Sequence, residues 1–172
     1  MAGIGARWQT RRMKTLMLVR HAKSDWGQPG LADHDRPLND RGLRDAPAMG
    51  VRLRERGAIP DAIVSSTALR AQTTAKLIAT ELGLDAASVE LDDRLYGSSP
   101  QTILRVVGEL DDEVVRAMIV AHNPGMADLA YDLTESIGEM PTCAVLELDF
   151  DIDEWVEVEF QAPVATRFDT PR

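Results

Sequence analysis

The sequence predicts a three-layer α/β/α fold. It should have a mostly parallel central sheet, helices on both faces of that sheet and an antiparallel hairpin at the C-terminus. Two observations predict this class. Short apolar runs alternate with longer segments whose apolar residues recur at helical spacing, as in layered α/β domains. Near the end of the chain the pattern changes to an alternation of apolar and acidic residues, which is typical of a hairpin.

The first predicted strand and helix are separated by a polar loop. Residues 15–19 are short, continuous and apolar, which predicts a buried strand. Residues 22–38 are polar and rich in glycine and proline, which favours a loop. Asn39 is a typical N-cap residue, and the helix that it opens should end near Gly57. Pro47 lies inside this helix and should kink it or start a second segment.

The middle of the chain repeats this arrangement. Residues 61–65 predict a second strand, and Thr67 is expected to cap a helix with one apolar stripe. Gly83 should stop that helix, and a short strand over residues 88–91 follows. A further helix is expected over residues 100–110.

The last elements complete the predicted sheet. Residues 116–121 predict a strand, and Pro124 suits the first turn of a helix that runs to about Glu135. Residues 143–150 and 154–160 alternate apolar with acidic residues and predict the two strands of the terminal hairpin.

Length and composition fit one globular domain. We expect residues 1–13 to be a disordered extension, residues 14–165 to form the domain and residues 166–172 to be a tail. The extension is basic and contains no acidic residue, so an organellar transit peptide is an alternative, and Met13 also resembles an alternative start.

Charge and cysteine content exclude several classes of protein. The net charge of −9 argues against a nucleic-acid-binding protein, and no apolar run is long enough to span a membrane. A single cysteine, Cys143, cannot form an intrachain disulfide, which fits a reducing compartment and predicts a cytoplasmic protein.

Charged and imidazole side chains follow three of the predicted strands. Arg20 and His21 follow the first strand, Arg70 follows the second and His122 follows residues 116–121. Ligands of open α/β sheets bind beyond the carboxyl ends of the strands, so these side chains should meet there. Arginine forks match phosphoryl oxygens, and a neutral imidazole, with an ordinary pKa of about 6.5, is a nucleophile for phosphorus.

Plainer interpretations stay open at this point. A single histidine after a strand is often a packed or surface residue, and an arginine in the first turn of a helix is usually solvated. A metal site is the other alternative, but His21, His34 and His122 lack the spacing of common ligand sets. We therefore expect no metal and no other cofactor.

Three motifs resemble those of a known family. They are Arg20-His21 after a strand, Ser-x-x-x-x-Arg-Ala-x-x-Thr from Ser65 to Thr74, and His-Asn-Pro at 122–124. In this order they resemble the histidine phosphatase superfamily, which has a phosphoglycerate-mutase-like fold. More narrowly, the sequence LVRHAKSDW at 18–26 is similar to the SixA phosphohistidine phosphatase group, as is the segment Asp35-Arg36-Pro37-Leu38. The likeness covers most of residues 14–160.

The resemblance implies a metal-independent phosphatase with a defined set of site residues. His21 would be the nucleophile that becomes transiently phosphorylated, and Arg20, Arg70 and His122 would complete the phosphate pocket. The remaining implied substrate contacts are Arg36, Ser24 and Asn123. The alternative for Arg36 is a loop arginine paired with Asp33 or Asp35, and Ser24 and Asn123 are equally compatible with turn residues.

Two positions depart from the family pattern. Ala22 follows the histidine where the superfamily usually has glycine. The general acid is also unassigned: Asp93 is the candidate, but Gly97 stands where the acid is expected, and a surface acidic pair explains Asp92 and Asp93 equally well. A phosphohistidine (P–N) substrate depends less on such an acid than a phosphomonoester does, because its imidazole leaving group can be protonated beforehand.

The substrate and partners stay open between several alternatives. The expected partner is a phosphorylated small molecule or a phosphohistidine protein, and the sequence does not determine the oligomeric state. A small-molecule phosphatase or a mutase of the same fold would share this site. A non-catalytic module that binds phosphate is the alternative from a different class.

Overall fold

The computed structural model describes residues 12–172 and contains one six-stranded mixed sheet in the order β3-β2-β4-β1-β5-β6. The strands are β1 (Met13–Arg20), β2 (Ala62–Ser66), β3 (Glu90–Asp92), β4 (Arg116–Ala121), β5 (Val145–Asp151) and β6 (Ala165–Asp169). The first four are parallel to one another, and β5 and β6 are antiparallel to their neighbours. The mostly parallel sheet with an antiparallel end is therefore confirmed.

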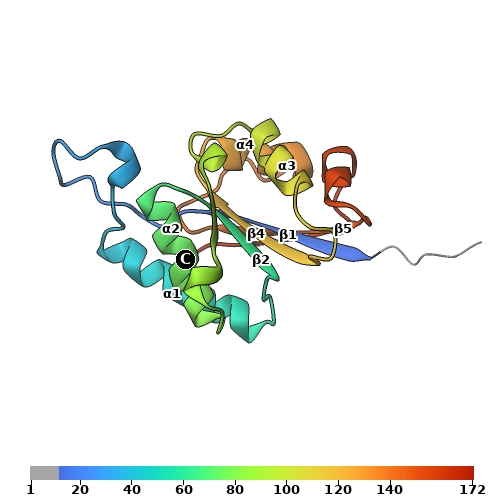
Figure 1. Cartoon of the computed structure of the whole chain (residues 1–172), viewed down its shortest axis with the longest axis horizontal. Helices are drawn as coiled ribbons and strands as arrows, with labels where there is room; N and C mark the ends of the chain where they lie inside the picture. The colour runs from blue at the N-terminus through green and yellow to red at the C-terminus, as the bar shows by residue number, and fades with distance from the viewer. Residues whose placement is uncertain (1–11) are drawn as a thin grey trace, which may run out of the picture.

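Helices cover both faces of this sheet (Figure 1). They are α1 (Asp40–Glu55), α2 (Leu69–Glu81), α3 (Pro100–Gly108) and α4 (Gly125–Thr134). Short 3₁₀ helices are η1 (Asp33–Asp35), η2 (Ala86–Ser88), η3 (Asp93–Leu95) and η4 (Trp155–Phe160). Successive residues of β1 point to opposite faces: Leu16 and Leu18 pack with α3 and α4, whereas Met17 and Val19 pack with α1 and α2. The predicted three layers are confirmed.

The start of α1 fixes the loop that follows β1. The Asn39 side chain accepts a hydrogen bond from the Gly42 amide, which confirms the predicted N-cap. The backbone amide of Asn39 donates to the Lys23 carbonyl. A Cβ on Gly42 would stand 2.2 Å from that same carbonyl oxygen, so only glycine allows this contact. The helix runs on through Pro47, so the expected second segment is absent.

Two local predictions are wrong for identifiable reasons. Thr67 does not cap α2: the N-cap position is Ala68, and the Thr67 hydroxyl bonds to His34 instead. Residues 154–160 form η4 and not a strand. Trp155 and Val158 are both buried and lie three residues apart, so the buried positions have a helical period.

The second strand of the terminal hairpin comes later in the chain than predicted. It is β6, which pairs with β5 from Val145↔Asp169 to Asp149↔Ala165. Residues 166–169, which we assigned to the C-terminal tail, therefore form most of this strand.

The N-terminal prediction concerns residues that the structure describes only in part. Residues 1–11 of the expected extension, 1–13, lie outside the described residues, and Met13 already belongs to β1. Over residues 12–172, none of the helices has both the length and the apolar character needed to cross a bilayer.

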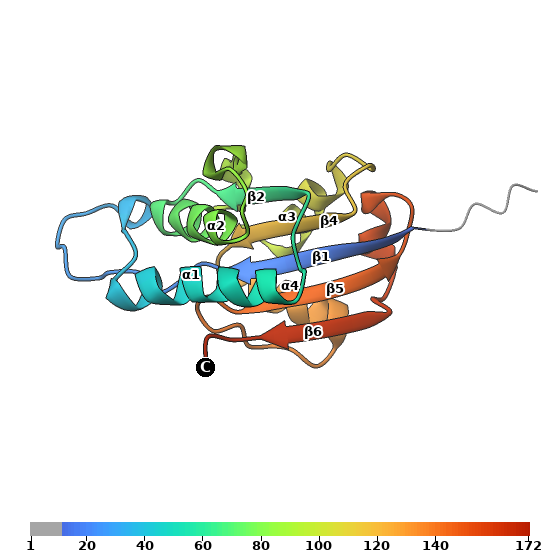
Figure 2. The same ribbon diagram turned by 90° about the horizontal axis from the view of Figure 1, so that it is seen from below.

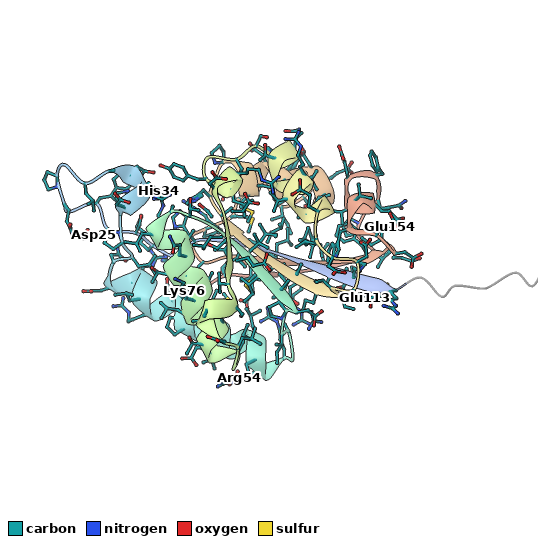
Figure 3. All side chains as sticks on the ribbon, viewed as in Figure 1. Asp25, His34, Arg54, Lys76, Glu113 and Glu154 are labelled. Atoms are coloured by element: carbon teal, nitrogen blue, oxygen red, sulfur yellow. The ribbon has the colours of Figure 1, made fainter. Side chains whose placement is uncertain are left out.

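The carboxyl ends of the parallel strands all lie at the same end of the sheet, beside the projecting loop that precedes α1 (Figure 2). Figure 3 shows Asp25 and His34 on this loop, whereas Glu113, which precedes β4, lies at the opposite end of the molecule. The residues that follow β1, β2 and β4 are therefore gathered at one end.

We predict that Gly42→Ala lowers the free energy of unfolding by about 1–3 kcal/mol, because the new methyl group collides with the Lys23 carbonyl. Urea denaturation measures this change. Gly108→Ala is the matched control, since its Cβ would meet its nearest neighbour at 3.5 Å and alanine favours a helix. Equal stability of the two variants would contradict the close contact.

Candidate active site

The pairing of β1 with β4 brings the two predicted catalytic histidines together. Arg20 lies opposite Ala121 in the parallel register, so His21 and His122 follow at neighbouring strand ends. Their ring centroids are 5.0 Å apart. Arg70 comes from the first turn of α2, directly after β2 on the other side of β4. Both imidazoles and the Arg70 side chain are buried.

A cavity of about 280 Å³ opens at this point. Its lining residues are Arg20, His21, Lys23, Ser24, Trp26, Arg36, Arg70, His122, Asn123 and Thr142. All seven residues that the family resemblance implied for the site are in this set. The lining contains three arginines and a lysine but no aspartate or glutamate, so it is strongly basic on a chain of net charge −9.

One hydrogen bond fixes the tautomer of His21. Its Nδ1 lies 2.7 Å from the backbone carbonyl oxygen of Ala22. A carbonyl only accepts, so Nδ1 carries the proton and Nε2 keeps its lone pair. Burial, together with the neighbouring charges of Arg70 and Arg20, lowers the pKa of His21 to about 3. The ring is therefore neutral at physiological pH and presents an unprotonated nitrogen.

His122 has the complementary arrangement. Its Nε2 lies 2.8 Å from the Ser66 hydroxyl oxygen, which already accepts a bond from the Ala68 amide. The Ser66 hydroxyl has one proton to donate, and we assign that proton to the bond with Nε2, which places the proton of His122 on Nδ1. Burial, and then the charge of Arg70, lowers the pKa of His122 to about 4. His122 is thus a neutral hydrogen-bond donor, and the neighbouring His21 is a neutral acceptor.

Several buried polar atoms lack a partner within residues 12–172. They are Nε of Arg20, Arg70 and Arg116, Nδ1 of His122 and Oδ1 of Asn123. Arg116 lies at the amino end of β4, away from the cavity, but the other residues line it. An unsatisfied buried donor costs about 1–3 kcal/mol. Three such donors belong to residues that line the basic cavity, which favours an anion as its ligand.

Arg36 is held at the mouth of the cavity from several sides. Its guanidinium donates to Ser24 Oγ at 2.8 Å and to Asp33 Oδ1 at 3.0 Å, and it stacks on the Trp26 ring at 3.5 Å. Arg36 therefore forms the ion pair with Asp33 that the alternative interpretation expected, and it also lines the cavity. The Ser24 hydroxyl supports Arg36 by accepting its hydrogen bond.

Asp33 is the functional residue that the sequence analysis did not select. Its carboxylate accepts from Arg36, from Arg70 Nη2 at 3.1 Å and from the Tyr96 hydroxyl at 2.7 Å. Its backbone carbonyl accepts from Arg70 Nη1. The Tyr96 hydrogen bond, followed by those from Arg36 and Arg70, holds the pKa of Asp33 well below its usual range. One carboxylate thus orients two cavity arginines and stays ionised.

The Met140 carbonyl orients two further residues of the cavity lining, Arg20 and Asn123. It accepts from Arg20 Nη1 at 2.9 Å and from Asn123 Nδ2 at 3.0 Å. Arg20 uses Nη1 for this bond, and its buried Nε has no partner among residues 12–172.

The candidate general acid lies outside the cavity lining. Asp93 is exposed at the start of η3. Its neighbour Asp92 pairs with Arg94, which also bonds Glu109 on the surface. The structure adds no support for Asp93 as the acid, and its assignment stays a prediction.

The described residues form no group of side chains suited to a metal ion. No group of three or more His, Cys, Asp and Glu side chains among them is arranged to hold one.

A larger cavity of about 480 Å³ lies between the end of α4 and η4, but it is lined by acidic and neutral residues, without any histidine or arginine. It therefore does not compete with the basic cavity for a phosphoryl group.

Comparison with known proteins agrees with this geometry. The family model described as the histidine phosphatase superfamily (branch 1) matches residues 16–98. Rv1276c, an uncharacterised protein of Mycobacterium tuberculosis, is 33% identical over 165 residues, which span 90% of this chain and 100% of that protein. The chain belongs to the histidine phosphatase superfamily.

Solved structures place it in the SixA-like group of this superfamily. SixA from Agrobacterium tumefaciens is 28% identical with a TM-score of 0.73, and the match covers 90% of this chain and 97% of that one. The protein histidine phosphatase SixA complexed with tungstate has a TM-score of 0.73 at 19% identity, with coverage of 91% and 94%. The sequence-based recognition of both the superfamily and the group is confirmed.

We predict that Ser66→Ala lowers kcat for p-nitrophenyl phosphate about tenfold, equivalent to about 1.4 kcal/mol. The variant removes the hydrogen bond that fixes the His122 tautomer. Ser65→Ala is the control, because Ser65 is equally buried and its hydroxyl bonds only the Ser66 carbonyl. Equal losses in both variants would contradict the role of the Ser66 hydroxyl.

The lowered pKa of His122 predicts a pH-dependent stability. In the unfolded chain His122 has its ordinary pKa of 6.5 and binds a proton below that pH, whereas in the folded chain it stays neutral down to about pH 4. The contribution of neutral His122 to the free energy of unfolding is therefore fully present above pH 6.5 and is lost as the pH falls. Between pH 7 and pH 5 the wild type should lose about 2 kcal/mol more than His122→Gln does. Urea denaturation at both pH values measures the difference, and parallel losses would contradict a neutral buried ring.

Proposed function

We propose that this member of the histidine phosphatase superfamily hydrolyses phosphomonoesters or phosphohistidine through a covalent phosphohistidine on His21. The observation that carries the proposal is that Arg20, Arg70 and His122, each with a buried, unpartnered N–H donor, line the same basic cavity as His21. Such donors match the charge that spreads over phosphoryl oxygens during transfer.

The first step transfers the phosphoryl group to the enzyme. The lone pair of His21 Nε2 attacks phosphorus, and the bond to the leaving group breaks on the opposite side, with its electron pair going to the leaving atom. Phosphorylated His21 then carries a positive charge, because Nδ1 keeps its proton. The Ala22 carbonyl, 2.7 Å from Nδ1, stabilises this charge.

The second step regenerates the enzyme. Water attacks the phosphorus, the P–N bond to His21 breaks and its electron pair returns to Nε2. The proton of the water goes to the phosphate that leaves. The same arginines and His122 hold the phosphoryl oxygens in both steps, and no step needs a metal ion.

A phosphohistidine (P–N) substrate fits the cavity better than an alcohol ester does. The cavity lining contains no carboxylic acid that would protonate an alkoxide. The imidazole of a phosphohistidine accepts a proton before the bond breaks and so departs without enzymic help. The tungstate-bound structure that this chain resembles is that of a protein histidine phosphatase, which favours the same choice. A phosphohistidine protein in the cytoplasm is thus the proposed partner.

We predict that His21→Ala abolishes turnover of p-nitrophenyl phosphate and of phosphohistidine, together with ³²P labelling of the protein. The loss follows because the variant has no nitrogen to accept phosphorus. Labelling in the wild type should be stable to alkali and labile to acid, as expected for a P–N bond. His34→Ala is the control, since His34 lies outside the cavity lining.

Three outcomes would contradict the proposal. Labelling or turnover that survives in His21→Ala would remove the nucleophile. Loss of activity on chelation would indicate a metal-dependent hydrolase. Binding of vanadate by a wild type that turns over none of these substrates would indicate a phosphate-binding module.

A further inference from the structure

A second cavity of about 310 Å³ adjoins the basic one. Its lining residues are Gly97, Ser98, Ser99, Pro100, His122, Asn123, Pro124, Gly125 and Asp128. His122 and Asn123 line both cavities, so they form a common wall. The volume is sufficient for an imidazole ring or a group of similar size.

The two segments that line this second cavity are in contact with each other. A Cβ on Gly125 would stand 2.0 Å from the Ser98 carbonyl oxygen, so the start of α4 and the loop after η3 are in direct backbone contact. The cavity is therefore formed by two elements that support one another.

Most polar groups around the second cavity are already engaged. The Ser98 hydroxyl donates to the Leu95 carbonyl, and the Ser99 hydroxyl caps α3 by accepting from the Thr102 amide. In the first turn of α4, the amides of Met126 and Asp128 donate to backbone carbonyls. These two amides of the helix start are therefore not available to a ligand.

The carboxylate of Asp128 is the charged group that remains available. Asp128 is exposed, and its side chain makes no hydrogen bond or ion pair within residues 12–172. Together with the unpartnered Oδ1 of Asn123, it gives this cavity acceptors and no free cation. The second cavity thus has the opposite polarity to the basic cavity beside it.

The second cavity adjoins the basic cavity without containing His21. His21 lines only the basic cavity, whereas His122 and Asn123 line both. In-line transfer requires the leaving atom to stand opposite the attacking nitrogen, so the leaving group cannot occupy the side of the phosphoryl group that faces His21. The adjoining cavity, which lacks His21, offers room for this group.

We propose that the second cavity receives the leaving group of the substrate and that Asp128 selects leaving groups that carry a positive charge or an N–H donor. A protonated imidazole satisfies both conditions. A leaving group with a carboxylate is disfavoured, because it would face Asp128 with a like charge. This inference rests on the proposed phosphatase function, since it names the substrate class for the same site.

Binding measurements on His21→Ala test the selection separately from turnover. The probes are O-phosphoethanolamine and phosphoglycolate, which share a phosphate and two carbons but end in an ammonium and a carboxylate. By titration calorimetry, His21→Ala should bind phosphoethanolamine at least about tenfold more tightly, a difference of about 1.4 kcal/mol. Adding Asp128→Lys should abolish or reverse this preference.

Asp132→Lys in the same background is the matched control. Asp132 lies one turn further along α4, is exposed and does not line the second cavity, so the preference should persist. Equal effects of the two lysine variants would overturn the proposal, as would tighter binding of phosphoglycolate or binding of neither probe by His21→Ala. Failure of the phosphatase function itself shows separately, as activity or labelling that survives loss of His21.

Discussion

The parallel pairing of β1 with β4 sets the positions of both histidines, because Arg20 lies opposite Ala121 in that register. Both strands are buried in the middle of the sheet, with apolar side chains packed on each face. A slip of one residue would turn the side chains of β1 to the opposite faces and separate His21 from His122. The same contacts that stabilise the core therefore align His21, the proposed nucleophile, with His122.

Burial gives the two histidines their chemistry. The loss of solvent lowers the pKa of His21 to about 3 and that of His122 to about 4, so both rings stay neutral between two arginines. The hydrogen bond that His21 donates to the Ala22 carbonyl fixes its tautomer, and His122 is bonded to the Ser66 hydroxyl through Nε2. The site keeps donors without a partner in a buried place, which is a cost to stability that the proposed anion would remove on binding.

Much of this arrangement could be predicted from the sequence. The strands were visible as short apolar runs, and their carboxyl ends identified Arg20, His21, Arg70 and His122. Asp33 and Tyr96 could not be found in this way, because neither directly follows a strand: Asp33 begins η1 and Tyr96 follows η3. Their hydrogen bond forms only in the folded chain. Ser66 looked like any other small residue at a strand end. At residues 154–160 an alternating pattern was misleading, since the buried side chains there are three residues apart.

A crystal structure with vanadate tests the central claim most directly, because vanadate imitates the phosphoryl group in transfer. We predict a bond from vanadium to Nε2 of His21, with Nδ1 still bonded to the Ala22 carbonyl. Vanadate oxygens should contact the guanidinium groups of Arg20 and Arg70 and the ring of His122. Vanadate held away from His21, or bonded through its Nδ1, would contradict the account.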